Sequence, residues 1–124
     1  MIKYSLLLFV VVFLSCVKDK AANALELVES TSNDSFCDTV SVSFSASILP
    51  IFNQSCATSN CHNSTSASAG YILGSHTQIS SNATIALKSI QHNGASAMPK
   101  AQPQLNDSLI QQFECWIKQG KLNN

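Results

Sequence analysis

The sequence predicts a small all-α domain of three to four short helices. Apolar residues recur at three- and four-residue intervals in three segments, residues 47–54, 82–93 and 106–120. Only "TVSVSF", residues 39–44, alternates polar and apolar residues as a strand would. A chain of 124 residues has room for one domain. A domain this small buries a low fraction of its surface, so it usually needs a covalent staple or a cofactor.

The first predicted helix runs through "SILPIFNQ", residues 47–54. Its apolar residues share one face at helical spacing: Ile48, Leu49, Ile51 and Phe52. Pro50 has no backbone N–H and is tolerated only in the first turn, so we expect the helix to start near Ser47. This helix leads the chain directly into Cys56.

A middle helix is predicted in "NATIALKSIQHN", residues 82–93, with Asn82 as its N-cap. The residues that it offers for burial are Ile85, Leu87 and Ile90. Gly94 ends the helix, and the loop "ASAMPKAQPQ" with its two prolines follows.

The last helix has the strongest local signals. Asn106 is a suitable N-cap, Asp107 suits the positive end of the helix dipole, and Gly120 suits the C-terminal stop. Between these residues lies one apolar stripe: Leu109, Ile110, Phe113, Trp116 and Ile117.

The N-terminal segment has the layout of a bacterial secretion signal. "MIKYSLLLFVVVFLSC" contains one lysine, an apolar run too short to span a membrane, and a small residue before Cys16. "FLSC" also resembles a bacterial lipobox, which implies a lipid on Cys16; an ordinary signal peptide cut elsewhere is the alternative. We therefore expect a lipoprotein signal peptide over 1–15, a lipidated flexible tether over 16–36 and the folded domain over 37–124.

The charge balance excludes one class of partner. Seven lysines offset seven acidic residues, and there is no arginine. A neutral chain of this kind offers no electrostatic basis for binding nucleic acid. Secretion also places the cysteines in an oxidising compartment, where each is expected to have a covalent partner.

The segment "CATSNCHNST" carries the chemistry. Cys56, Cys61 and His62 supply two thiols and an imidazole in the order used for c-type haem attachment, C-x-x-C-H, but with a gap of four residues in place of two. The additional residues need only loop outward for both thiols and the imidazole to reach one macrocycle. A haem iron in an electron carrier takes a second axial ligand, often a methionine sulfur.

Met98 is the candidate for that second ligand. Once the signal is removed it is the only methionine, and it lies in a loop with almost no other apolar residue to pack against. His92 and His76 are the competing candidates, and each can also be read as a surface histidine.

From Ser43 to Asn124 the sequence resembles a small class I monohaem cytochrome c of bacteria. The matching pieces are "SILPIFNQSC", the "CH" that follows, "AMPK" and "LNDSLIQQFECWIKQGKLNN". The resemblance implies an all-α fold of three to four helices around one covalently bound haem c, held by Cys56 and Cys61 with His62 and Met98 on the iron. The four-residue gap resembles a variant found in some multihaem cytochromes.

The same resemblance implies single-electron transfer rather than enzymatic catalysis. With the lipid anchor, it places the protein outside the cytoplasm, on a membrane, with redox proteins as partners. No distal acid–base pair of His and Arg is present, so a haem that senses gas or reduces peroxide is the weaker alternative.

Cysteine accounting predicts one disulfide. With Cys16, Cys56 and Cys61 assigned, Cys37 and Cys115 remain. At 100° per residue Cys115 lies opposite the apolar stripe of the last helix, facing whatever covers that side, and the segment around Cys37 is the natural cover. A Cys37–Cys115 bridge would stabilise the domain by about 3–4 kcal/mol in the chain-entropy model. The alternative leaves one of the two as a free or intermolecular thiol.

Two further interpretations of the cysteines stay open. A zinc or copper site would combine Cys56, Cys61 and His62 with His76 or His92, although neighbouring side chains diverge and rarely reach one small ion together. A disulfide-stabilised surface lipoprotein without a redox role would join Cys56 to Cys61 in a local bridge.

Overall fold

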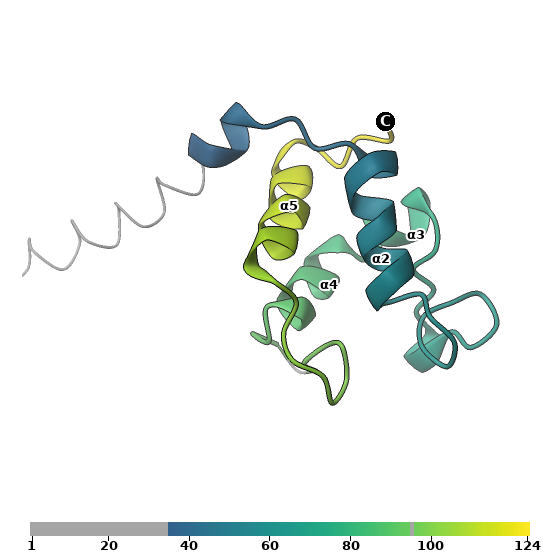
Figure 1. Cartoon of the computed structure of the whole chain (residues 1–124). Coiled ribbons are helices and arrows are strands. Elements are labelled where there is room, and N and C mark those ends of the chain that lie inside the picture. The colour runs from purple at the N-terminus through teal and green to yellow at the C-terminus, as the bar shows by residue number, and fades with distance from the viewer. Residues whose placement is uncertain (1–34, 95) are drawn as a thin grey trace, which may run out of the picture. The chain divides into compact units, whose positions relative to one another are not determined.

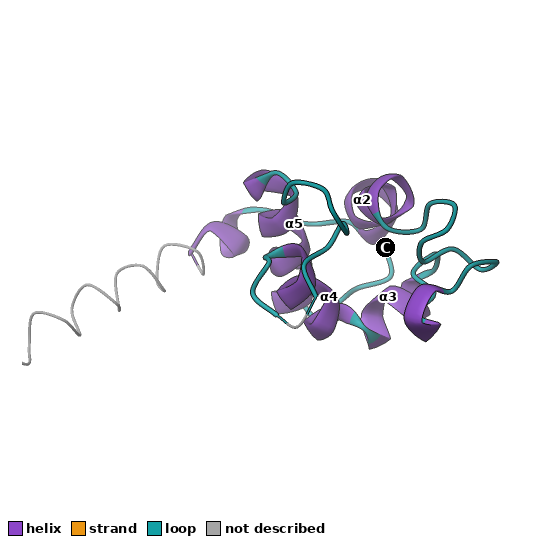
Figure 2. Ribbon diagram, turned by 90° about the horizontal axis from the view of Figure 1, so that it is seen from below, coloured by secondary structure: helices purple, strands orange, loops and turns teal. Residues whose placement is uncertain are grey.

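The computed structural model describes residues 35–94 and 96–124, so the predicted signal peptide, the lipidated Cys16 and most of the tether lie outside the described residues. Cys37–Asn124 forms one compact unit. Its elements are a π-helix η1 (Phe44–Ile48), α2 (Leu49–Ser55), a 3₁₀ turn η2 (Ser68–Gly70), α3 (His76–Ser81), α4 (Ala83–Ile90) and α5 (Asp107–Lys118) (Figures 1 and 2). Residues 35–39 are also helical.

The all-α prediction is confirmed for the described residues, which contain no strand. The segment "TVSVSF" does not pair with anything as a strand. Residues 40–43 are irregular, and the chain turns into η1 at Phe44. A single alternating segment does not form a stable strand when no second segment is present to pair with it.

The first helix begins earlier than predicted. Ser43 caps η1 by accepting a hydrogen bond from the Ala46 N–H, and helical backbone runs on into α2. Pro50 does lie in the first turn of α2, as its chemistry demands. The π-helix η1 directly precedes α2, so the helical backbone begins at Phe44 and the expected start near Ser47 was wrong.

The middle region contains one helix that the sequence did not predict. α3 begins at the cap Ser75 and ends where Asn82 starts α4. Asn82 is the residue before α4, as predicted, but its side chain donates to the Gln78 carbonyl at 2.8 Å and does not cap α4. α3 was missed because Ile79 is its single buried residue, which leaves no periodic pattern.

α5 follows its prediction closely. The Asn106 side chain accepts from the Ser108 N–H at 3.0 Å, and Gly120 takes the positive φ of 89° that a glycine adopts without strain after a helix. Phe113 and Trp116 are fully buried. α5 packs against η1 and α4, and Figure 2 shows it beside α4.

The centre of the domain is an aromatic core made by Phe44, Phe52, Phe113 and Trp116. The rings of Phe113 and Trp116 stack at 5.7 Å, and Phe52 meets Phe113 edge-on at 5.0 Å. Phe44 lies 5.7 Å from Trp116. This core packs η1 and α2 against α5 and thereby fixes the orientation of α2.

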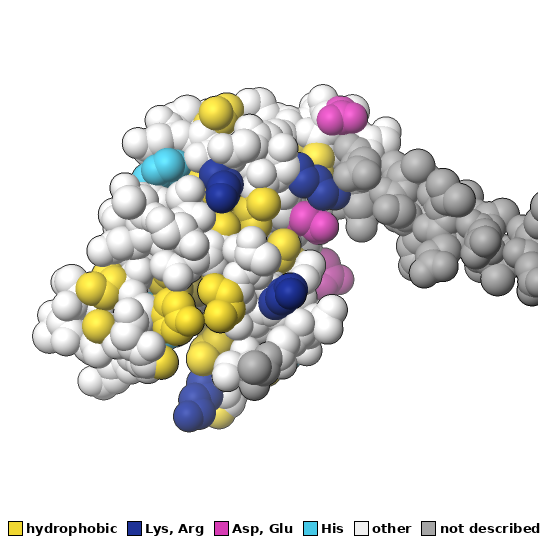
Figure 3. Space-filling model, turned by 180° about the vertical axis from the view of Figure 1, so that it is seen from behind, with side chains coloured by type: hydrophobic (Ala, Val, Ile, Leu, Met, Phe, Trp, Pro, Cys, Tyr) yellow, Lys and Arg dark blue, Asp and Glu magenta, His cyan; other side chains and the backbone are white. Residues whose placement is uncertain are grey.

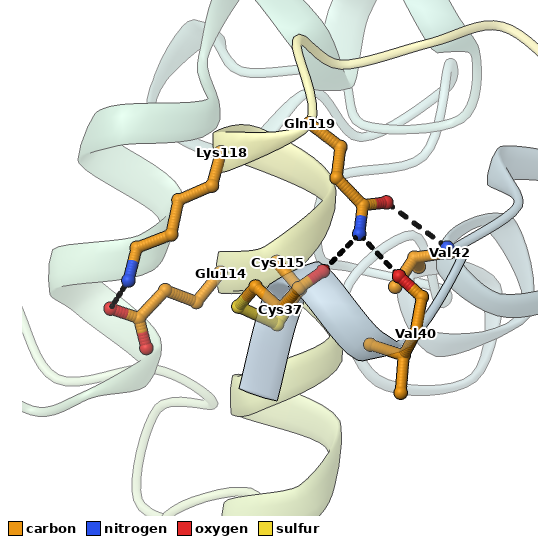
Figure 4. Close-up of a disulfide and its surroundings, with 7 residues drawn as sticks. All are labelled: Cys37, Val40, Val42, Glu114, Cys115, Lys118 and Gln119. Carbon is orange, nitrogen blue, oxygen red and sulfur yellow. Dashed lines mark hydrogen bonds and ion pairs between the residues drawn. A yellow bond between two sulfur atoms is a disulfide. The ribbon is translucent and has the colours of Figure 1, made fainter. Parts of the chain in front are cut away.

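The predicted disulfide is present. Cys37 and Cys115 are bonded, and Cys115 is fully buried beneath the segment that Cys37 belongs to (Figure 4). Gln119 reinforces this cover with its whole side-chain amide. Its nitrogen donates to the Cys37 and Val40 carbonyls at 2.8 and 2.6 Å, and its oxygen accepts from the Val42 N–H at 3.1 Å.

Candidate functional site

α2 positions the first thiol. The helix ends at Ser55, and the Cys56 and Ala57 N–H groups both donate to the Phe52 carbonyl, at 2.9 and 2.7 Å. Because Phe52 is packed in the aromatic core, the backbone at Cys56 is held in place relative to that core. The prediction that the helix leads directly into Cys56 is confirmed.

The gap between the thiols is a closed loop. The His62 N–H donates to the Cys56 carbonyl at 3.0 Å, and the Cys61 N–H donates to the Thr58 carbonyl at 3.1 Å. Asn60 takes a positive φ of 66°, which asparagine tolerates better than most residues. The hydrogen bond from the His62 N–H to the Cys56 carbonyl brings the two ends of the loop together. The two cysteines are therefore closer to each other than they would be if the four residues between them were extended.

His62 is held at three points. Besides the bond of its N–H to Cys56, its carbonyl accepts from the Leu73 N–H at 2.8 Å, and its ring Nδ1 lies 3.2 Å from the Tyr71 carbonyl oxygen. A carbonyl oxygen only accepts, so Nδ1 carries the proton. Nε2 is then the ring nitrogen left to bind a metal, as in metal-binding histidines whose other nitrogen is anchored to a carbonyl.

Met98 approaches from a different part of the chain. It lies in the segment after α4, and its N–H donates to the Ser89 carbonyl at 3.0 Å. Its side chain is half-buried. The bond to Ser89 ties the segment to the last turn of α4.

These residues line one cavity of about 860 Å³. A volume of this size is within the range of small-molecule and cofactor sites. The chemistry-bearing residues on its walls are Cys56, Cys61, His62 and Met98. Apolar side chains supply much of the remaining wall: Phe52, Tyr71, Leu73, Ile85, Ile90, Pro99, Pro103 and Leu105. The fold therefore brings together the two thiols, the imidazole and the thioether that the sequence singled out.

The two other histidines do not line this cavity. His76 packs edge-on against Phe44, and its Nε2 lies 2.8 Å from the Lys121 carbonyl. His92 is exposed, and its Nε2 lies 3.1 Å from the Met98 carbonyl.

The charge of the cavity comes from lysine. Lys88 and Lys100 are the charged residues among those that line it. Burial raises the pKa of the Cys56 thiol from 9.0 to about 11, and the nearby Cys61 adds to this because two thiolates would repel each other. Cys56 and Cys61 are not bonded to each other, and Cys56 is a neutral thiol at physiological pH.

Two large apolar side chains at the cavity are exposed. Ile85, predicted to be buried, is 50 % exposed, and Tyr71 is 36 % exposed. Ile90 is buried and Leu87 is half-buried, as expected of α4. Figure 3 shows hydrophobic side chains gathered in a hollow on one face of the molecule, with lysine side chains nearby. The prediction failed at Ile85 because none of the segments in residues 35–94 and 96–124 covers the part of α4 that faces the cavity.

Sequence reasoning missed the parts of the site that are backbone. The Tyr71 and Ser89 carbonyls, which hold His62 and Met98, have no side-chain signature in a sequence. Among the described residues, no group of three or more His, Cys, Asp or Glu side chains is arranged to hold a metal ion. None of the helices in that part of the chain is long and apolar enough to cross a membrane.

The chain matches no protein-family model, no curated protein and no solved structure.

Proposed function

We propose that this protein is a single-electron carrier that holds one covalently attached haem c. The observation that carries the proposal is the single cavity lined by Cys56, Cys61, His62 and Met98. These are the four groups that a thioether-bound haem with His/Met ligation requires. The protein would then resemble a small class I cytochrome c with a lengthened attachment loop.

Each of the four residues has a definite part. The Cys56 and Cys61 S–H groups would add across the two vinyl groups of haem, each sulfur bonding to one carbon while the proton goes to the other, so that nothing leaves. His62 would present its Nε2 to the iron, because Nδ1 is engaged with Tyr71. Met98 would supply the second axial ligand from the segment after α4.

The rest of the cavity suits the same group. Its apolar walls, with Ile85 and Tyr71 exposed, would be covered by a flat apolar macrocycle and would exclude water from it. Lys88 and Lys100 would supply positive charge for the two propionate carboxylates. Bound haem supplies an iron couple that takes up and releases one electron, and the chain needs only to hold it and tune its potential.

The cellular setting follows from the N-terminal sequence. With a lipid on Cys16 and a tether to residue 36, the domain would be an extracytoplasmic lipoprotein anchored to a membrane. Its partners would be redox proteins that exchange electrons with it by transient contact. An enzymatic role is not part of the proposal.

The test is covalent retention of haem. The full chain should be produced with a signal peptide in cells that attach c-type haem and then denatured before its visible spectrum is recorded. We expect the haem bands to stay with the polypeptide and to be lost in a Cys56→Ala/Cys61→Ala double variant, while a Cys37→Ser/Cys115→Ser variant keeps them. A wild-type chain that carries no haem after denaturation overturns the proposal, and the disulfide-stabilised surface lipoprotein becomes the better interpretation.

The second axial ligand has its own test. Methionine ligation gives oxidised haem a weak long-wavelength band from sulfur-to-iron charge transfer. We expect this band in the wild type and its loss in Met98→Ala, with covalent haem unchanged. A band that is absent in the wild type would remove Met98 from the proposal.

A further inference from the structure

We propose that His92 is a positioning residue that holds the backbone of Met98 and thereby keeps its thioether at the cavity. This inference rests on the proposed function, because it assigns His92 a task in ligation by Met98. It also replaces the sequence-based alternative in which His92 itself is the ligand. The juxtaposition of His92 with the Met98 backbone is what the structure adds.

Met98 is bonded through both of its backbone polar groups. Its N–H donates to the Ser89 carbonyl at 3.0 Å, and its carbonyl oxygen lies 3.1 Å from Nε2 of His92. Since a carbonyl only accepts, the His92 Nε2 carries a proton and donates. Two bonds, one to the N–H and one to the carbonyl of the same residue, hold the backbone of Met98 in place, and with it the point from which its side chain leaves the chain.

Both bonds lead to the C-terminal end of α4. The His92 N–H also donates to the Ser89 carbonyl, at 3.2 Å, so this carbonyl serves His92 and Met98 together. Ser89 lines the cavity next to Ile85 and Ile90 of the same helix. The position of Met98 is therefore set relative to a packed element, although none of the described residues from 91 to 105 is buried.

The conformation of His92 supports a dedicated role. Its φ is +53°, a left-handed backbone that residues other than glycine adopt uncommonly, although histidine, like asparagine and aspartate, adopts it more often than the rest. Such a conformation persists where the surrounding bonds demand it. Here it turns the chain at the end of α4 and returns the imidazole to Met98 six residues later. A glycine would make the turn without strain but would have no ring to donate.

The test compares two variants at one position in the haem-loaded full chain. His92→Gln keeps an N–H donor near the place of Nε2, and His92→Leu has none. Both residues bear the strain of the left-handed backbone equally, so their difference isolates the hydrogen bond. His76→Leu is the matched control, because its Nε2 also bonds to a backbone carbonyl, that of Lys121, away from the cavity.

Two measurements report on the hydrogen bond between His92 and the Met98 carbonyl. Added imidazole competes with the Met98 thioether, and its Kd is read from the visible spectrum. Loss of one hydrogen bond should make displacement easier, so we expect imidazole to bind roughly fivefold more tightly to His92→Leu than to His92→Gln. Exchange of the Met98 amide with deuterium, measured on the haem-free chain, should accelerate by a similar factor, and this second measurement does not involve the iron.

The outcomes separate this inference from the proposed function. Equal imidazole affinity and equal amide exchange in His92→Leu and His92→Gln overturn the positioning role and leave the electron carrier intact. The same change in His76→Leu as in His92→Leu also overturns it, since the effect would then be general destabilisation. If His92 were the ligand, the charge-transfer band would be absent in the wild type, His92→Leu would lose the low-spin spectrum, and Met98→Ala would change nothing. A wild-type chain without covalent haem overturns both proposals.

Discussion

The two sides of the domain are built on different principles. On the packed side, η1, α5 and the C-terminal residues 119–124 enclose a core in which Ile48, Phe113, Cys115 and Trp116 are fully buried. On the open side, the residues of the loop over 56–72 and the described residues of the segment 91–105 are half-buried or exposed, and Cys56 is among the half-buried ones. Yet the open side carries all four of the chemistry-bearing residues that line the cavity.

The polar groups of the packed side are satisfied within the chain. The Asn124 side chain accepts from the Phe44 N–H at 2.8 Å, the Trp116 Nε1–H donates to the Leu122 carbonyl at 2.8 Å, and Gln119 bonds three backbone groups. Among the described residues, no buried side-chain nitrogen or oxygen lacks a partner.

The open side is ordered by backbone bonds around an incomplete apolar surface. Bonds from His62 to Cys56 and from Met98 to Ser89 shape the walls, while Ile85 and Tyr71 face the cavity uncovered. The residues that stabilise the fold are therefore separated in space from the residues that line the candidate site. Changes on the packed side should reduce stability, whereas changes on the open side should affect mainly what the cavity holds.

Removing the disulfide should have the largest effect on stability. The bridge joins residues 78 positions apart and lies in the core. In Cys37→Ser/Cys115→Ser we expect the free energy of unfolding to fall by about 3–5 kcal/mol, because the unfolded chain regains the freedom that the bridge removes. Guanidinium unfolding of samples with equal haem content would measure this. A loss below about 1 kcal/mol would show that the packed side does not depend on this bond.

Raising the pH should lower the free energy of unfolding of the haem-free protein, because the Cys56 thiol on the open side loses its proton. The Cys56 thiol has its pKa raised from 9.0 to about 11, first by burial and then by Cys61. Between these pH values the unfolded chain has lost the proton and the folded chain keeps it, so stability is full below pH 9 and is lost as pH rises toward 11. The loss should reach roughly 2–3 kcal/mol.

Alkylation provides the matching measurement for that thiol. At constant iodoacetamide, modification of Cys56 in the folded haem-free protein should rise about tenfold per pH unit toward pH 11, because the thiolate is the nucleophile. Peptide mass spectrometry separates Cys56 from Cys61. Cys61→Ala removes the second cause of the shift, so alkylation of Cys56 should move to lower pH. A Cys56 that reacts fully at pH 8 would contradict its burial.

Gln119→Leu should be the costliest single hydrogen-bonding change on the packed side. It leaves the Cys37 and Val40 carbonyls and the Val42 N–H without their partner. We expect the free energy of unfolding to fall by about 2–3 kcal/mol. Gln112→Leu, within α5, should change it by less than about 0.5 kcal/mol. Equal effects of the two variants in chemical denaturation would mean that the cover over Cys115 is held by the disulfide alone.

The sequence predicted what depends on local pattern. Asn106 and Gly120 bound α5 as expected, and the position of Cys115 on the helix was enough to assign its partner Cys37. Gln119 gave no such signal, because its hydrogen-bond partners are backbone groups 77 to 82 residues away. The start of the first helix was predicted too late in the chain. Pro50 lies in the first turn of α2, but the helical backbone already begins before α2, in the π-helix η1.

The candidate site was predictable in its residues and not in its geometry. Cys56, Cys61, His62 and Met98 stand out by residue type, but the backbone bonds that hold His62 and Met98 have no pattern in the sequence. The burial of Ile85 was predicted from helical spacing, which assumes that another part of the chain covers each apolar face. Under the proposed function this assumption would fail at the cavity, because the group that covers Ile85 would be haem and not another part of the chain.

Ile85 therefore offers the smallest effect and the sharpest test of the comparison between the two sides. Its side chain is 50 % exposed in the chain alone, so Ile85→Ser should lower the stability of the haem-free protein by only about 1 kcal/mol. If haem fills the cavity, the exposed half of this side chain becomes buried as well, and the same substitution should cost about 2 kcal/mol in the haem-loaded protein. Chemical denaturation of wild type and variant in both forms gives the difference. Equal losses in the two forms would mean that α4 does not meet the bound group, and that the cavity is filled from another wall.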